Sequence, residues 1–112
     1  MVVPQPGQVV AVRFPFSDLS DAKLRPAILL ADAGNGDFIL CAITSKGYAD
    51  SHPVVLDPTD FTTGGLRLRS YARPGKLFTA SASLFASVEG QLTADALKQV
   101  IDAVVELLRP KP

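Results

Sequence analysis

An Asn-Gly pair at positions 35 and 36 most constrains how this chain can fold, because it separates two apolar runs of strand length. The runs are residues 26–31 and residues 38–43, and both turn residues tolerate positive φ. This pattern is typical of a tight antiparallel hairpin. In a hairpin centred on the pair, the numbers of opposed residues sum to about 71.

The hairpin register predicts which side chains meet at the far end of the two strands. Ala27 is expected near Thr44, with Arg25 just beyond it at the same end of the sheet. A slip of one residue would weaken this expectation. Pro26 restricts Arg25 to extended conformations, so the arginine is held where a polar loop becomes a strand. Loops carried on rigid scaffolds often hold binding and catalytic groups.

The rest of the chain reads as further short strands followed by a terminal helix. Alternating apolar residues predict a strand at 9–16. Further strands are expected at 54–56, 66–71, 76–79 and 88–92. Turns are expected at 57–65 and 72–75, and a short helical turn at 84–87. About seven strands and one helix indicate a mainly β fold, either a small curled sheet or a barrel.

The terminal helix has clear start and stop signals. Thr93 is expected to cap its first turn, Asp95 suits the positive end of the helix dipole, and Pro110 stops the helix. Its apolar stripe consists of Leu97, Val100, Ile101, Val104 and Leu108, widened by Val105 and Leu107. The stripe is broad for a helix on one side of a small barrel, so we expect core packing or, alternatively, a dimer contact.

Bulk properties limit the class of protein. The chain has 112 residues and no formal net charge, which indicates one domain and argues against non-specific polyanion binding. Residues 1–6 read as a loose N-terminal arm. Cys41 is the one cysteine and is expected to be buried in its apolar run. With no signal-peptide pattern and no membrane-length apolar run, we expect a cytoplasmic protein without membrane contact.

One block of the chain carries charge of a single sign. Residues 61–88 contain no acidic residue. The bases in this block are Arg67, Arg69, Arg73 and Lys76. The block is compatible with a solvated loop whose counter-charges come from elsewhere, and also with a local basic site.

The types of catalytic residue present narrow the chemistry. A hydrolase triad, a metal-binding cluster and a glycine-rich phosphate loop are all missing from the sequence. RNA cleavage by the RNA's own 2′-hydroxyl would need a second histidine beside His52 if it used a histidine pair. Arginine can stabilise a phosphate charge, although it is a poor acid in isolation. Taken alone, Arg25 is also compatible with an ordinary surface arginine, and Thr44–Ser45 with a turn that caps its own backbone.

Several motifs occur together in an order that is similar to one known family. They are Gly7–Asp18, Arg25–Ala27, Ala42–Ser45 and Arg73–Thr79, followed by Gly90–Leu92 before the terminal helix. This order and spacing resemble the MazF/PemK family of toxins from type II toxin–antitoxin modules, over about residues 7 to 108. The segment Ser45–Tyr48 is also similar to the one after the third strand in some members.

The resemblance implies one domain over residues 1–112 with an SH3-like barrel fold, related to that of the gyrase poison CcdB. It also implies a homodimer with metal-independent endoribonuclease activity and no cofactor. Members cut single-stranded RNA, usually mRNA, at short motifs, and attack by the 2′-hydroxyl leaves a 2′,3′-cyclic phosphate and a 5′-hydroxyl. A cognate antitoxin threads an acidic, disordered segment through the RNA groove, and the toxin–antitoxin complex is expected to bind DNA for autoregulation.

The resemblance assigns the catalytic roles to Arg25, in an Arg-Pro motif, and to Thr44, in an Ile-Thr motif. The arginine is expected to stabilise the phosphorane and to donate a proton to the leaving oxygen. The threonine is expected to orient the phosphate or the attacking hydroxyl, with Ser45 in support. The expected RNA contacts are Phe16, Ser17, Asp18, Lys46, Tyr48, Arg73 and Lys76. No metal ligand is expected.

Departures from the family pattern leave the RNA motif and two alternative functions open. Gly75 stands where members often have aspartate, and segment 32–37 is shorter than in many members. Asp18 and Asp21 are unexplained in an RNA-binding loop, because they would repel phosphate. The alternatives are a homologue that binds RNA without cutting it well, and a non-enzymatic gyrase poison similar to CcdB, in which the terminal helix would matter more than Arg25.

Overall fold

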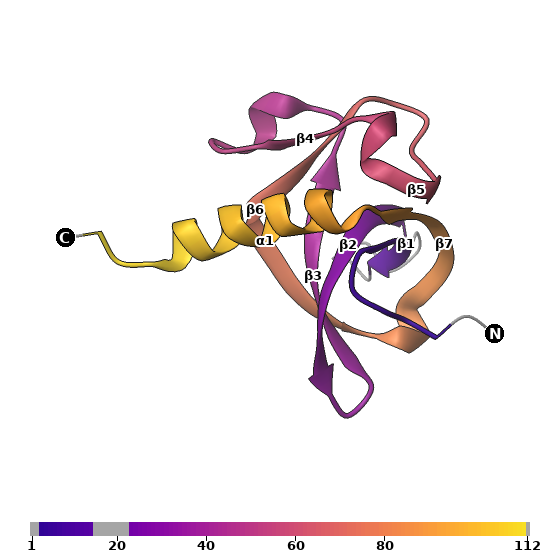
Figure 1. Ribbon diagram of the computed structural model, residues 1–112. Helices are drawn as coiled ribbons and strands as arrows, with labels where there is room; N and C mark the ends of the chain where they lie inside the picture. The colour runs from indigo at the N-terminus through magenta and orange to yellow at the C-terminus, as the bar shows by residue number, and fades with distance from the viewer. Residues whose placement is uncertain (1–2, 15–22, 112) are drawn as a thin grey trace.

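The computed structural model describes residues 3–14 and 23–111, which form seven strands and one α-helix (Figure 1). The strands are β1 (Gln8–Phe14), β2 (Lys23–Gly34), β3 (Asp37–Thr44), β4 (Val54–Leu56), β5 (Phe61–Gly64), β6 (Ser70–Ser81) and β7 (Phe85–Leu92). The helix is α1 (Ala94–Leu108), and three 3-10 turns are η1 (Gly47–Ala49), η2 (Pro58–Asp60) and η3 (Ala82–Leu84). Neighbouring strands are antiparallel in the order β4-β6-β3-β2-β1-β7-β5. This curled sheet with one C-terminal helix confirms the predicted mainly β fold.

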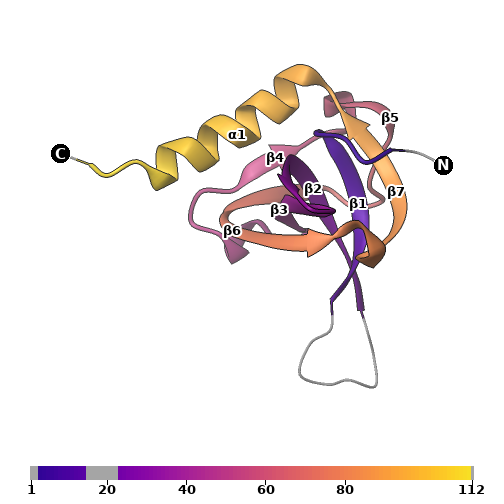
Figure 2. The ribbon, with the colours of Figure 1, turned by 90° about the horizontal axis from the view of Figure 1, so that it is seen from below.

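The central strands bury apolar side chains on both faces of the sheet. In β1, Val9 belongs to a cluster with Ala96 and Val100 of α1, whereas Val10 and Val12 belong to a second cluster on the opposite face. Burial on both faces explains the continuous apolar run in β2, because a strand covered on both sides cannot alternate with polar residues. Figure 2 shows α1 lying along one side of the sheet, where it contacts β6, β4 and β7.

The predicted hairpin is confirmed, but its register differs from the simple one. Asn35 and Gly36 have φ of 57° and 81° and connect β2 to β3. Two register shifts within the β2–β3 ladder then move the pairing by two residues, so that Ala27 pairs with Ala42 and not with Thr44. The same register, continued to the end of β3, sets Arg25 opposite Thr44. The bulges therefore bring the two side chains closer along the strands than the unbulged register did.

The segment around residues 65–76 corrects three local predictions. Residues 65–69 form no strand, and regular pairing starts only at Ser70, so the predicted strand at 66–71 is wrong over most of its length. Residues 61–64, predicted as part of a turn, form β5 against β7. The turn predicted at 72–75 is wrong, because β6 is continuous there; its ladder with β3 shifts register so that residues 73–76 lie opposite Ala42 alone, and we call this break in the ladder the interruption in β6. Pro74 explains the interruption, since proline has no N–H to donate to the ladder.

The start of α1 was predicted correctly, but the start of β7 and the burial of the last turn of α1 were not. The helical turn expected at 84–87 lies earlier, as η3, and β7 begins at Phe85. Thr93 caps α1 as predicted, because its Oγ1 accepts the N–H of Ala96 at 3.0 Å. Leu108, assigned to the buried stripe, is 68% exposed, because the last turns of α1 extend past the sheet (Figures 1 and 2). Within the described ranges, no helix has the length and apolar character needed to cross a membrane.

Candidate functional site

A cleft of about 420 Å³ opens where β2 begins and β3 ends. The irregular segment 65–69 and the interruption in β6 form its other walls. The charged side chains that line it are Arg25, Lys46, Arg67, Arg73 and Lys76. No carboxylate is among the lining residues in the described part of the chain. The cleft is therefore suited to bind a polyanion.

Arg25 and Thr44 both line this cleft, as the predicted hairpin requires. Thr44 Oγ1 accepts the backbone N–H of Lys46 at 3.0 Å. The turn in which Thr44 caps its own backbone, one of the two interpretations of Thr44–Ser45, is thus present. A hydroxyl that accepts one hydrogen bond still has its own proton to donate, so this contact holds the Thr44 oxygen in place and leaves its O–H available. A guanidinium and an oriented hydroxyl in one cationic cleft are suitable donors to the oxygens of a phosphodiester.

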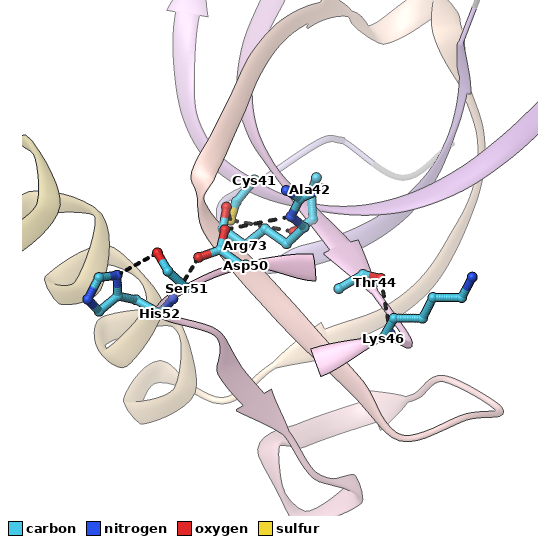
Figure 3. A network of polar contacts seen from close by, with 8 residues as sticks. All are labelled: Cys41, Ala42, Thr44, Lys46, Asp50, Ser51, His52 and Arg73. Atoms are coloured by element: carbon cyan, nitrogen blue, oxygen red, sulfur yellow. Dashed lines mark hydrogen bonds and ion pairs between the residues drawn. The ribbon is translucent and has the colours of Figure 1, made fainter. Parts of the chain in front are cut away.

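Arg73 enters the cleft from the interruption in β6 and is held from behind by Asp50. Its Nε lies 3.6 Å from Asp50 Oδ2, and Figure 3 shows the two side chains pointing toward one another. Asp50 Oδ1 accepts the backbone N–H of His52 at 2.9 Å. The Asp50 side chain is only 7% exposed, compared with 26% for Arg73. A buried carboxylate therefore faces the back of a cleft-lining arginine.

Cys41 lies directly behind this part of the cleft wall. Its thiol donates to the carbonyl oxygen of Arg73, with Sγ and the oxygen 3.2 Å apart. Burial raises the pKa of Cys41 to about 11. The predicted burial of Cys41 is confirmed, since none of its surface is exposed. A protonated, buried thiol is a packing group here and not a nucleophile.

The other predicted site residues fall into three groups. Ser45, Lys46 and Lys76 line the cleft with Arg25 and Thr44. Tyr48 lies in η1 and is 83% exposed, but it is not one of the cleft-lining residues. Phe16, Ser17 and Asp18 lie outside the described residues, as does Asp21, for which no role was predicted.

His52 takes no part in the cleft. Its Nδ1 is 3.0 Å from Ser51 Oγ, and it lies away from Thr44 in Figure 3. It lines a separate cavity of about 200 Å³ together with Leu107 and other residues at the end of α1.

Sequence reasoning missed Arg67 as a site residue, because it assigned residues 66–71 to a strand. The acid-free block at 61–88 was the signal that could have identified it. Leu66 and Leu68 also line the cleft beside Arg67, so its cationic wall carries apolar surface as well. Arg25 and Arg67 also line a neighbouring cavity of about 250 Å³, whose lining includes Glu89.

The cleft offers hydrogen-bond donors and positive charge, and its chemistry follows from that. Among residues 3–14 and 23–111, no group of three His, Cys, Asp or Glu side chains could hold a metal ion. A ligand that carries its own nucleophile beside a phosphodiester would need only such donors and a proton source from the protein.

Comparison with known proteins identifies what this chain is similar to. The family described as PemK-like, MazF-like toxin of type II toxin–antitoxin system matches residues 5–108. No curated protein matches the sequence.

Solved structures share the fold over nearly the whole chain. MazE–MazF (Form-III) from Deinococcus radiodurans superposes with a TM-score of 0.76 at 22% identity, covering 96% of this chain and 97% of that one. An endoribonuclease in complex with its cognate antitoxin, from a mycobacterial species, has a TM-score of 0.71 at 17% identity and covers 100% of both chains. An endoribonuclease from a mycobacterial species has a TM-score of 0.72 at 19% identity, covering 100% of this chain and 98% of that one. At these identities the likeness establishes the fold.

Proposed function

Because this chain belongs to the family of PemK-like, MazF-like toxins of type II toxin–antitoxin systems, we propose that it is an endoribonuclease that cuts single-stranded RNA. The observation that carries the proposal is the presence of Arg25 and Thr44 in one cleft lined by five cations. The endoribonucleases and MazF proteins that share the fold support the same activity.

The proposed reaction uses a nucleophile that the RNA supplies. The 2′-hydroxyl gives its proton to solvent water as its oxygen attacks the adjacent phosphorus, and the new P–O bond forms as the bond to the 5′-oxygen breaks. Arg25 stabilises the charge of the phosphorane and supplies the proton that leaves with the 5′-hydroxyl, and solvent water then reprotonates Arg25. Thr44, aimed by the N–H of Lys46, donates to a non-bridging oxygen. The products are a 2′,3′-cyclic phosphate and a 5′-hydroxyl, and no metal ion or cofactor takes part.

The remaining cations of the cleft would hold the RNA backbone on either side of the reacting phosphate. Lys46, Arg67, Arg73 and Lys76 are the candidates for these contacts. Ser45 would support Thr44 from the adjacent position. Tyr48 is exposed enough to stack on an unpaired base outside the cleft.

Two protein partners are part of the proposal. A cognate antitoxin with an acidic, disordered segment would block RNA by lying in the same cationic cleft, because both ligands are polyanions. A homodimer is supported by the apolar end of α1, where Val105, Leu107 and Leu108 are exposed.

Cleavage of a long single-stranded RNA in EDTA, followed by mapping of the new ends, tests the activity. Discrete cuts with cyclic-phosphate ends are expected from the wild type, and Arg25→Ala should lower the rate at least about 100-fold. Thr44→Val and Thr44→Ser form a matched pair, because valine keeps the shape and serine keeps the hydroxyl. The serine variant should retain most activity and the valine variant should lose it.

Cleavage, RNA binding and growth arrest, measured for the wild type and for Arg25→Ala, separate the alternatives. Binding without cleavage would identify a homologue that only binds RNA. Growth arrest that survives Arg25→Ala and is relieved by a resistant gyrase would identify a gyrase poison. Cleavage that requires a divalent ion, or that persists in Arg25→Ala, would refute the proposed mechanism.

A further inference from the structure

We infer that Asp50 is a positioning residue that fixes the Arg73 guanidinium for contact with an RNA phosphate. The inference rests on the proposed RNA-binding function of the cleft. Asp50 does not line the cleft itself, so it would act only through Arg73.

The contact between the two side chains has an unusual geometry. Arg73 Nε is buried and, among the described residues, has no hydrogen-bond partner, while Asp50 Oδ2 lies 3.6 Å away. That separation is beyond hydrogen-bond range but close enough for strong attraction where water is excluded. A buried N–H of this kind is costly unless a charge faces it, and Asp50 is the charge that faces it.

Asp50 is anchored by a backbone hydrogen bond and lies close to Gly75. Its Oδ1 accepts the N–H of His52, which ties the carboxylate to its own loop. A Cβ added at Gly75 would lie 3.4 Å from Asp50 Oδ2 and 3.7 Å from a Leu107 methyl carbon. The carboxylate therefore lies close to the interruption in β6, near the end of α1.

A fixed carboxylate behind Nε would fix the plane of the whole guanidinium. The five N–H groups of arginine lie in one rigid plane, so holding the Nε edge sets the direction of the two terminal nitrogens. Arg73 lines the cleft, and its two terminal guanidinium nitrogens could bind a phosphate in a bidentate contact. An arginine oriented in advance loses less rotational freedom when RNA binds.

Positioning and simple electrostatics predict opposite effects of removing Asp50. If Asp50 acted only as a negative charge, its removal would make the site more positive and RNA binding tighter. If it positions Arg73, its removal leaves the guanidinium free to rotate and RNA binding becomes weaker. The sign of the change therefore distinguishes the two roles.

The test is a double-mutant cycle in kcat/KM for cleavage of a short RNA that contains the mapped site. Asp50→Ala and Arg73→Ala should each lower kcat/KM by about tenfold, mostly through KM. Adding Asp50→Ala to Arg73→Ala should cause no further loss, since the first residue acts through the second. Asp50→Asn keeps an oxygen for the His52 N–H and should lose less than Asp50→Ala. Equal losses in both backgrounds, or tighter binding in Asp50→Ala, would overturn the inference.

Asp32→Ala is the matched control for the loop contact. Asp32 Oδ1 accepts the N–H of Gly34 at 2.8 Å, the same two-residue spacing as in Asp50, but at the exposed hairpin and without an arginine. This variant should cleave RNA like the wild type. A loss as large as that of Asp50→Ala would show that the local turn matters and not the arginine.

A readout without RNA separates this inference from the proposed function. The Nε–H resonance of Arg73 in a ¹⁵N-labelled sample should exchange slowly with water in the wild type and much faster in Asp50→Ala. If the wild-type protein neither cuts nor binds RNA, the proposed function fails, while this resonance still reports whether Asp50 orders Arg73. An Nε–H that exchanges equally in both proteins would overturn the positioning role.

Discussion

Raising the salt concentration should weaken RNA binding steeply, by an amount set by the cations of the cleft. Each phosphate contact releases counterions, and for single strands the slope of log K against log salt is about −0.7 per contact. The five cations that line the cleft give a limiting slope of about −3.5 if all of them contact phosphates. Between about 50 and 200 mM salt, the affinity should then fall by about 100-fold.

Fluorescence anisotropy with a 2′-O-methyl oligonucleotide measures this slope without cleavage, because the attacking hydroxyl is blocked. Arg67→Ala should reduce the size of the slope by about 0.7. Lys98→Ala is the control, because Lys98 is exposed on α1 and paired with Asp102 at 2.7 Å, away from the cleft. A slope smaller in size than about 1, or an equal effect of Lys98→Ala, would refute the assignment of the cleft as the RNA site.

Three further predictions concern stability, each measured as the free energy of unfolding in urea. Gly64→Ala should destabilise the protein by more than about 2 kcal/mol, because φ is +64° and the new Cβ would overlap the carbonyl oxygen of Glu89. The control is Gly36→Ala, which should lose only about 1 kcal/mol, because φ is +81° but the space around it is open. Equal losses in the two variants would contradict this prediction. Thr93→Ala should remove about 1 kcal/mol by deleting the cap of α1, whereas Thr93→Ser should keep it. Since burial raises the pKa of Cys41 to about 11, the unfolded thiol ionises first as pH rises. Stability should therefore be intact below about pH 9 and fall by roughly 2–3 kcal/mol between about pH 9 and 11, and Cys41→Ala should lack this loss.

The predictions that proved correct depend on interactions between residues close in the sequence, whereas the strand prediction that proved wrong does not. The Asn35–Gly36 turn and the Thr93 cap depend on backbone preferences and hydrogen bonds within a few residues, and both are confirmed. The strand predicted at 66–71 rested on alternation alone, and the structure has no strand at 65–69. Alternation shows that a segment has two faces, but not that another strand is available to pair with it.

The candidate site shows the same division. Residue pattern was enough to put Arg25 and Thr44 at one end of the sheet, because a two-residue turn fixes which strand ends meet. Their alignment depended on two bulges in the β2–β3 ladder, which no feature of the sequence marked. Leu108 was assigned to the core by its helical spacing, but it is exposed because the end of α1 extends past the sheet.

By itself, the sequence determined the hairpin, the helix ends and the shared end of the sheet for Arg25 and Thr44, since each follows from turn chemistry or capping. Only the tertiary structure decided that Arg67 and Arg73 join Arg25 in one cleft and that Asp50 stands behind Arg73. The positions of these side chains depend on where Pro74 interrupts β6 and on how the loop before β4 packs against the end of α1. Both are fixed by tertiary contacts between residues that lie far apart in the sequence.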